Sequence, residues 1–212
     1  MVISVLSAVA RGDNEIVVTL EIKDGANFQR ERYLLSVGLF ADLGIRVGEC
    51  DRDYYDAICR ASKVYTAEKR GLNILGYGAC SEKALYMKLV SRGTPKDIAA
   101  EAVERIVAQG YMNSDGDALR EAQRCVAKRW GQKRIVAHLR SKGYADESVK
   151  RAIYALEDEG ADFTQVCLER LKATYSALPT DREDMRKLVA ALSRYGFSTS
   201  EIREAIKAFG ED

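Results

Sequence analysis

The sequence predicts a mainly α-helical protein in which three tandem three-helix repeats form an elongated, curved array after a small N-terminal β-hairpin and helix region. Three observations support this fold class. Two β-branched runs lie near the start of the chain, helix-start and helix-end signals follow one another from about residue 66, and one motif recurs three times. With 212 residues, of which 47% are hydrophobic and 31% charged, the chain has the composition of a folded globular protein.

The N-terminal region predicts a hairpin with a helix packed on it. Ile3 to Val9 and Glu15 to Ile22 are rich in β-branched residues and are separated by a turn. A two-stranded hairpin is marginally stable alone, so it needs a partner. We expect the stretch from Glu31 to Leu43 to form a helix that supplies this partner and ends at Gly44. Asp51 is the predicted N-cap of the next helix.

Helix boundaries are predicted from caps and glycines. Thr94 to Asp97 suggests a threonine N-cap followed by proline at the first helical position. Thr180 to Glu183 and Ser198 to Glu201 predict capping boxes, and Ser114 to Asp117 is a weaker start. Three glycines are expected to end helices in the left-handed conformation: Gly93, Gly143 and Gly196.

These three glycines mark an internal repeat. The segments LVSRGT (89–94), LRSKGY (139–144) and LSRYGF (192–197) are versions of one motif, spaced 50 and then 53 residues apart. Together with the helix before each motif, they predict three helices in each of residues 66–109, 114–159 and 162–209. We therefore divide the chain into an N-terminal region, 1–63, and three repeats, 64–110, 111–160 and 161–212. Stacked repeats of this kind favour binding over catalysis.

A strongly basic segment runs from Arg120 to Tyr144, with Glu121 as its single acid and Gly131 as the predicted break between two helices. Like charges four residues apart destabilise an isolated helix by about 0.2–0.5 kcal/mol per pair. This series of cations therefore indicates either a surface that binds an anionic partner or an ordinary solvated helix face. The net charge is only +1, so any nucleic-acid surface is a local patch. The candidate partner- and DNA-binding residues are Arg120, Arg124, Lys128, Arg129, Lys133, Arg134, Arg140 and Lys142.

No catalytic constellation is predicted. The single histidine, His138, lies beside Ile135 and Leu139 and is expected at the edge of the core rather than as a base or metal ligand. Five widely spread cysteines without a C-x-x-C pair suit neither a disulfide framework nor a zinc site. Nucleotide-binding glycine motifs are missing from the sequence. We expect no catalytic residue, no metal and no cofactor, and a cytoplasmic protein without signal peptide or membrane span.

Three stretches resemble the RecX family of bacterial recombinase regulators: GLNILGYGACSEKALYMKLVSRG (71–93), IVAQGYMN (106–113) and KRWGQKRIVAHLRSKGY (128–144). The family pattern is ALxYLxxRxRSxxELxxKLxxKG, then a GYLDD-type turn, then GxxRIxxELxxKG. The resemblance covers roughly Thr66 to Phe209. Two departures occur: Gly78 to Cys80 replaces a basic-Pro-basic segment, and Asp117 stands where the family has an aromatic residue. The matching residues are Leu72, Asn73, Leu75, Tyr77, Ser81, Glu82, Lys83, Leu85, Lys88, Leu89, Gly93, Gly110, Tyr111, Met112, Asn113, Gly131, Arg134, Ile135, Leu139, Lys142 and Gly143.

The resemblance implies a non-enzymatic modulator of the RecA recombinase. Such a protein binds the RecA filament on single-stranded DNA and blocks its extension or promotes its disassembly, so that ATP hydrolysis and strand exchange fall. The implied partners are the RecA filament and single-stranded DNA, with double-stranded DNA as an alternative, and we expect a monomer. Two other hypotheses stay open. One is a helix-turn-helix-like transcriptional regulator whose recognition helix begins at Gln132, and the other is a helical-repeat scaffold for protein interactions.

Overall fold

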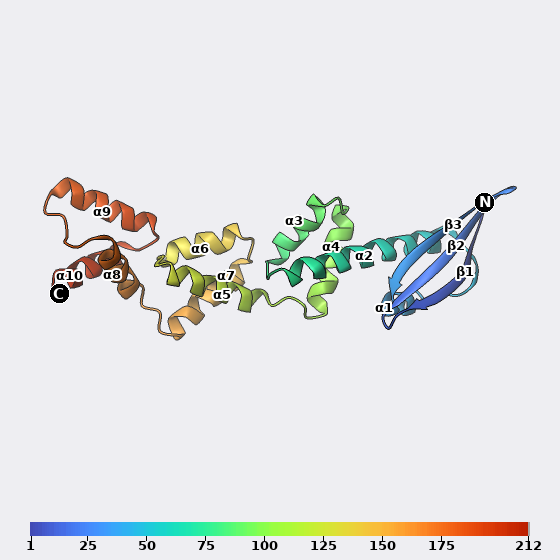
Figure 1. Ribbon diagram of the computed structural model, residues 1–212, viewed down its shortest axis with the longest axis horizontal. Helices are drawn as coiled ribbons and strands as arrows, with labels where there is room; N and C mark the ends of the chain where they lie inside the picture. Colours follow the sequence, from blue (N-terminus) through green and yellow to red (C-terminus); the bar gives the residue numbers. More distant parts are fainter. Residues whose placement is uncertain (212) are drawn as a thin grey trace. The chain divides into compact units, whose positions relative to one another are not determined.

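The computed structural model describes residues 1–211, which form four strands and ten helices (Figure 1). The mainly helical fold with a small N-terminal β region is confirmed. No helix in the described part of the chain is long and apolar enough to span a membrane. The chain divides into two compact units. Unit 1 comprises residues 1–78 and 85–111, and unit 2 comprises residues 79–84 and the chain from Met112 onward.

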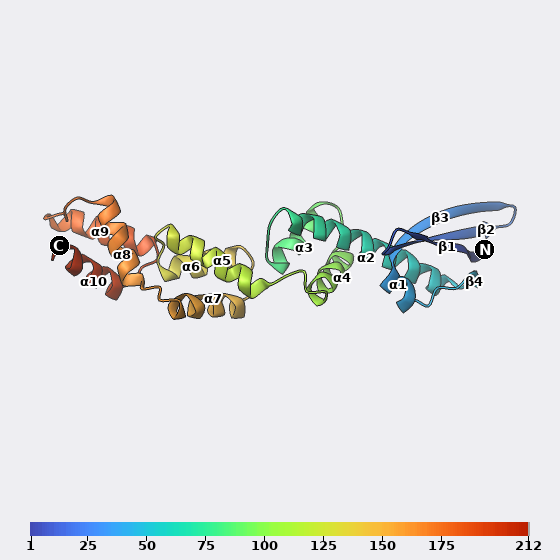
Figure 2. The same ribbon diagram turned by 60° about the horizontal axis from the view of Figure 1, so that its bottom comes forward.

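The sheet of unit 1 has four antiparallel strands in the order β3-β2-β1-β4 (Figure 2). They are β1 (Val2–Arg11), β2 (Glu15–Asp24), β3 (Asn27–Ser36) and β4 (Gly48–Cys50). The predicted hairpin is therefore present as β1 and β2. β2 pairs on both sides within the sheet, and its Val18 and Leu20 are completely buried in the core between the sheet and the helices α1 (Val37–Asp42) and α2 (Arg52–Gly76).

The prediction of a helix from Glu31 to Leu43 is wrong. β3 occupies most of that stretch and pairs with β2 from Glu15 opposite Ser36 to Asp24 opposite Asn27, and only α1 (Val37–Asp42) is helical. Ten residues of backbone pairing satisfy the open edge of the hairpin, which a helix would leave unpaired. Gly44 does end α1, with a φ of 56°.

The long helix α2 (Arg52–Gly76) joins the sheet to the helical part of unit 1. Asp51 is its N-cap, as predicted, because its carboxylate accepts a hydrogen bond from the Tyr54 amide at 2.7 Å. The first half of the helix packs Ile58 and Tyr65 into the core beneath the sheet. The second half packs on α4 (Lys96–Ala108) through an apolar cluster made of Val64, Ala67, Ile98 and Ala102. α2 runs unbroken through residues 63 and 64.

Three successive sets of three helices follow, as the repeated motif predicts: α2, α3 (Glu82–Ser91) and α4; α5 (Ser114–Ala127), α6 (Gln132–Ser141) and α7 (Asp146–Asp158); α8 (Phe163–Thr174), α9 (Arg182–Arg194) and α10 (Thr199–Phe209). In each set the first and third helices pack together most extensively. In unit 2, one buried cluster lies around Ile135 and Leu139 and another around Leu171 and Phe197. The elongated, curved shape of the array and the division at residues 63, 110 and 160 stay predictions.

The helix ends were predicted well and the helix starts less so. Gly93, Gly143 and Gly196 have φ values of 86°, 85° and 95°, as expected for left-handed C′ residues. Ser198 forms the predicted capping box with Glu201. In two other helices the cap lies one residue away from the predicted position. The first-turn amides of α9 donate to Asp181 rather than to Thr180, and those of α5 donate to Asn113 rather than to Ser114.

The predicted N-cap at Thr94 is wrong. Pro95 occupies the N-cap position of α4, and no side chain bonds to the first turn from there. Because Thr94 lies one residue too early, its hydroxyl cannot reach those amides, and it has no hydrogen-bond partner within residues 1–211.

Candidate nucleic-acid interface

The eight predicted cations lie on α5, on α6 and at the turns that end them. α5 ends at Ala127, and the left-handed residue in the turn is Arg129, with a φ of 55°, rather than Gly131. Gly131 is instead the N-cap of α6 and meets the end of α9, because its amide donates to the Tyr195 carbonyl at 2.8 Å. A Cβ at Gly131 would lie 2.5 Å from the Gly196 carbonyl oxygen. The glycine thus permits a close backbone approach and not the break itself.

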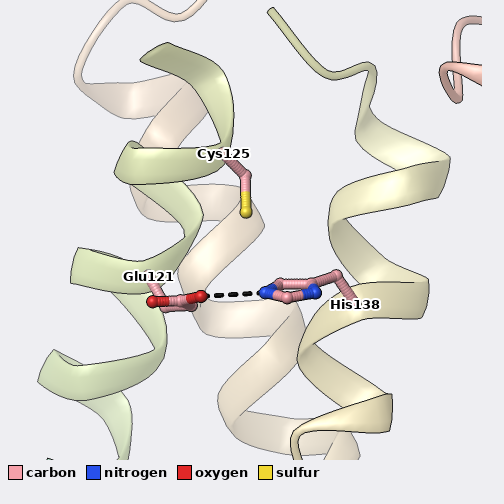
Figure 3. A group of neighbouring side chains, drawn as sticks. All are labelled: Glu121, Cys125 and His138. Atoms are coloured by element: carbon pink, nitrogen blue, oxygen red, sulfur yellow. Dashed lines mark hydrogen bonds and ion pairs between the residues drawn. The ribbon is translucent and has the colours of Figure 1, made fainter. Parts of the chain in front are cut away.

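At the centre of this helix pair, Glu121 and Cys125 of α5 face His138 of α6 (Figure 3). The spacing of four residues places Glu121 and Cys125 on one side of α5. The His138 Nε2 lies 2.8 Å from Glu121 Oε1, and both side chains are about one-fifth exposed, at 23% and 20%. His138 lies at the edge of the core beside the buried Ile135 and Leu139, where its neighbours in sequence predict it.

The hydrogen bond controls the charge of Glu121. The bond to His138 is the main cause that lowers the pKa of this carboxyl group, whereas burial raises the pKa. The positive charge of Lys142 and a hydrogen bond from Arg124 lower the pKa further. Burial raises the pKa of the Cys125 thiol, and Glu121 adds to that rise. The cluster therefore holds an ionised carboxylate and a protonated thiol at neutral pH.

Four of the eight cations surround this cluster. Lys128, Arg134 and Lys142 lie near enough to Cys125 to oppose the rise in its pKa, and Arg124 reaches Glu121 at 3.5 Å. These residues come from the side of α5, from the turn that ends it, and from the start and the end of α6. We call Arg124, Lys128, Arg134 and Lys142 the α5–α6 basic surface.

Arg134 differs from the other three because aromatic rings hold it on two sides. Its guanidinium lies 4.1 Å from the centre of the Trp130 ring and 4.9 Å from that of Tyr195. Arg170 stacks against Tyr195 at 3.3 Å, and Lys128 lies 5.7 Å from the Trp130 ring. Cation–π contacts of this kind contribute about 0.5–2 kcal/mol each. Arg134 therefore joins α6 to α9 as well as contributing charge, a role that its sequence position does not reveal.

The remaining four cations point elsewhere or are paired. Arg120 forms an ion pair with Asp117, which is buried at the position where the resembling family has an aromatic residue. Arg140 pairs with Asp146 at 2.8 Å, and Arg129 lines a cavity beside α8. Lys133 is exposed. Glu121 is therefore not the only counter-charge of the basic segment, because the fold adds Asp117 and Asp146 from outside it. Exposed ion pairs contribute only about 0–1 kcal/mol, so a phosphate can replace them.

The Glu121, Cys125 and His138 ligand atoms all lie within 4.8 Å of one another, a separation that a zinc ion could bridge. The chemistry of the donor set argues against that use. The carboxylate and imidazole already bond to each other, the thiol is held protonated, and four cations surround the cluster. We therefore assign the cluster to packing between α5 and α6.

The start of α6 is poorly suited to read DNA bases. Gln132 donates to Glu157 of α7 at 3.2 Å, and Arg134 is stacked between two rings. Base-edge recognition needs side chains that are free to enter a groove. The helix-turn-helix hypothesis therefore gains no support here.

Comparison with known proteins adds relatives and solved structures, although no family model matches the chain. The regulatory protein RecX of Xanthomonas axonopodis pv. citri (strain 306) is 29% identical over 154 residues, which cover 72% of this chain and 93% of that protein. The regulatory protein RecX of Vibrio cholerae serotype O1 (strain M66-2) is 28% identical over 148 residues, covering 69% and 95%.

Two crystal structures share the fold. One, of a regulatory protein RecX, superposes with a TM-score of 0.74 at 20% identity and covers 97% of this chain and 99% of its own. The other, of RecX from Lactobacillus salivarius, has a TM-score of 0.61 at 22% identity and covers 72% and 99%.

Proposed function

We propose that this chain, which belongs to the RecX family of regulatory proteins, is a non-enzymatic modulator of the RecA recombinase. It would bind the RecA filament on single-stranded DNA and block filament extension or promote disassembly. The observation that carries the proposal is the α5–α6 basic surface, because four cations lie around the Glu121 and Cys125 cluster in a chain whose net charge is only +1.

An anionic partner is the natural complement of this surface. Glu121 lies at its centre but is already hydrogen-bonded to His138, so one carboxylate serves several cations. Phosphate groups would supply the missing negative charge, and each neutralised phosphate makes binding depend on salt. An acidic groove of a protein filament would be recognised in the same way.

The decisive experiment is ATP hydrolysis by RecA on single-stranded DNA, titrated with the protein at fixed salt. The test variant combines Arg124→Glu and Lys128→Glu, which reverses two exposed cations and leaves the stacked Arg134 in place. The matched control combines Arg182→Glu and Arg186→Glu, two exposed cations of α9 with the same charge change. We expect the wild type and the control to inhibit hydrolysis and the test variant to inhibit at least about tenfold less well.

The shape of the titration separates two modes of action. Inhibition well below one protein per RecA favours action at filament ends or disassembly. Inhibition only near saturation of the DNA favours competition for the strand. If the wild type left hydrolysis unchanged, the modulator proposal would fail and the protein-interaction scaffold would replace it. Equal inhibition by the test variant would remove the α5–α6 basic surface from the mechanism.

A further inference from the structure

Unit 1 contains a cavity of about 370 Å³ that the proposed function does not use. Its walls come from β3, from the middle of α2 and from the loop that leads into α4. Three cations, Arg32, Lys63 and Arg70, line it, and none of its lining residues is acidic. The cavity therefore has a one-sided charge within a nearly neutral molecule.

The helical period explains how α2 supplies this wall. Cys59, Lys63, Thr66 and Arg70 follow one another at spacings of four, three and four residues, which places them on one side of the helix. Arg32 reaches the same cavity from β3. Two distant parts of the sequence thus place positive charge around one space.

These three cations are unpaired, unlike their neighbours on α2. Arg60 bonds to both Asp97 and Glu101, and Lys69 bonds to Glu15. Within residues 1–211, Arg32, Lys63 and Arg70 have no carboxylate partner, and all three are exposed. The acids Asp97, Glu101 and Glu15 are thus paired with cations on other sides of α2, and none of the three cations at the cavity has an ion-pair partner in the described chain.

Thr94 supplies an independent observation at the cavity wall. Its side chain is buried, at 6% exposure, and its hydroxyl oxygen has no hydrogen-bond partner in the described chain. The other three hydroxyls of the lining are occupied. Ser62 accepts from the Leu34 amide at 3.1 Å, and Thr66 donates to the Ser62 carbonyl at 2.9 Å. The Tyr33 hydroxyl donates to the Glu31 carboxylate. Buried hydroxyls are normally paired, so an unpaired one beside a cationic cavity indicates a ligand that accepts hydrogen bonds.

We propose that this cavity is a phosphate-binding site. Arg32 and Arg70 would donate to the phosphate oxygens, Lys63 would add a point charge, and the Thr94 hydroxyl would donate the hydrogen bond that it lacks in the free protein. The phosphate belongs either to a free phosphate or nucleotide or to the backbone of a nucleic acid. The site lies on unit 1, so it does not depend on the α5–α6 basic surface of unit 2.

The first test titrates inorganic phosphate into the full-length chain at constant ionic strength and follows the amide signals of Gly93, Thr94 and Lys96 by NMR. We expect saturable shifts in the wild type and a dissociation constant at least about tenfold higher in the variant Lys63→Gln with Arg70→Gln. The control, Arg46→Gln with Lys88→Gln, removes two exposed cations of unit 1 outside the cavity and should bind like the wild type. Unsaturable shifts, or equal binding by both double variants, would overturn the proposal.

The second test concerns Thr94, because its hydroxyl is unpaired without ligand. Thr94→Val should raise the melting temperature of the free protein by about 2 °C or more, since it removes a buried unpaired group, yet it should weaken phosphate binding. Thr94→Ser keeps the hydroxyl and should restore binding. A Thr94→Val protein that binds phosphate as well as the wild type would contradict the site.

A twelve-nucleotide single strand of thymidine then distinguishes the two sources of the phosphate. If the strand displaces inorganic phosphate from the wild type but the signals of the Lys63→Gln and Arg70→Gln variant do not respond, the site binds a nucleic-acid backbone. If the strand leaves bound phosphate in place, the site binds a free phosphate or nucleotide. Either result supports a phosphate site, provided that the first test shows saturable binding.

Discussion

The hydrogen bond between Glu121 and His138 is an internal link of the proposed interface, and it should make the stability of unit 2 sensitive to acid. Bonding to His138 lowers the pKa of Glu121 below its ordinary value of 4.5. The folded state therefore holds the ionised carboxylate more strongly than the unfolded chain does. The resulting stabilisation is fully present above about pH 4.5 and is lost as the pH falls through the lowered pKa.

Glu121→Gln should consequently lower the free energy of unfolding at pH 7 by roughly 1–2 kcal/mol. It should also flatten the decline of stability below pH 4.5. Urea unfolding between pH 3 and pH 7 measures both effects. Glu147→Gln is the control, because Glu147 forms only an exposed pair with Lys150, and it should change the stability by less than about 0.5 kcal/mol. If the free energy of unfolding of Glu121→Gln declined below pH 4.5 as steeply as that of the wild type, the bond would not affect folding.

Two cysteines should be chemically silent in the folded protein. Cys125 and Cys167 are fully buried, and burial raises the pKa of both thiols, that of Cys167 to about 12. Because the thiolate is the reactive form, neither should react with a thiol reagent at pH 8 until the chain unfolds. Mass spectrometry of peptides labelled with and without denaturant checks this. Rapid native labelling of Cys167 would mean that α8 and α10 open readily.

At the scale of the helices, the contact between the start of α6 and the end of α9 should be intolerant of a single methyl group. Gly131→Ala would place a Cβ 2.5 Å from backbone atoms of Gly196 and Phe197, which no side-chain rotation can relieve. We expect a loss of roughly 2–3 kcal/mol in the free energy of unfolding, measured by urea denaturation. The loss should accompany a change in the fluorescence of Trp130, because Arg134 would move from its place between Trp130 and Tyr195.

Gly76→Ala is the matched control for this substitution. Gly76 lies in the last turn of α2, and an added Cβ there meets no atom within 4 Å. Alanine favours a helix over glycine by up to about 1 kcal/mol, so this variant should be neutral or slightly more stable. Equal behaviour of the two variants would indicate that the α6–α9 contact relaxes freely.

The helices also show which parts of the fold were predictable. The glycines at 93, 143 and 196 and the Ser198 box were found because each is decided by a few neighbouring residues. β3 was missed because its leucines fit a helix as well as a strand, and its pairing with β2 decides between them. The role of Gly131 was missed for a similar reason, since only the distant Gly196 explains it.

For the whole molecule, the cations of the interface could be predicted from the sequence but not their grouping. The basic segment stands out because it has one internal acid. Folding then turns Arg129 toward α8, pairs Arg140 with Asp146 and collects Arg124, Lys128, Arg134 and Lys142 around Glu121 and Cys125. Periodicity within one helix gives a stripe, whereas a patch built from two helices depends on how they pack.

This grouping makes the salt dependence of DNA binding a quantitative test. Each neutralised phosphate on a single strand contributes about 0.7 to the slope of log affinity against log salt, so four cations predict a slope near −3. Lys128→Gln with Lys142→Gln should reduce the magnitude of the slope by about 1.4, as measured by fluorescence anisotropy with a labelled oligonucleotide. Arg182→Gln with Arg186→Gln changes the net charge equally and should leave the slope unchanged, because these exposed residues begin α9. Equal slopes for the two double variants would mean that the strand responds to the charge of the whole molecule, and the α5–α6 basic surface would then be no more than a solvated face.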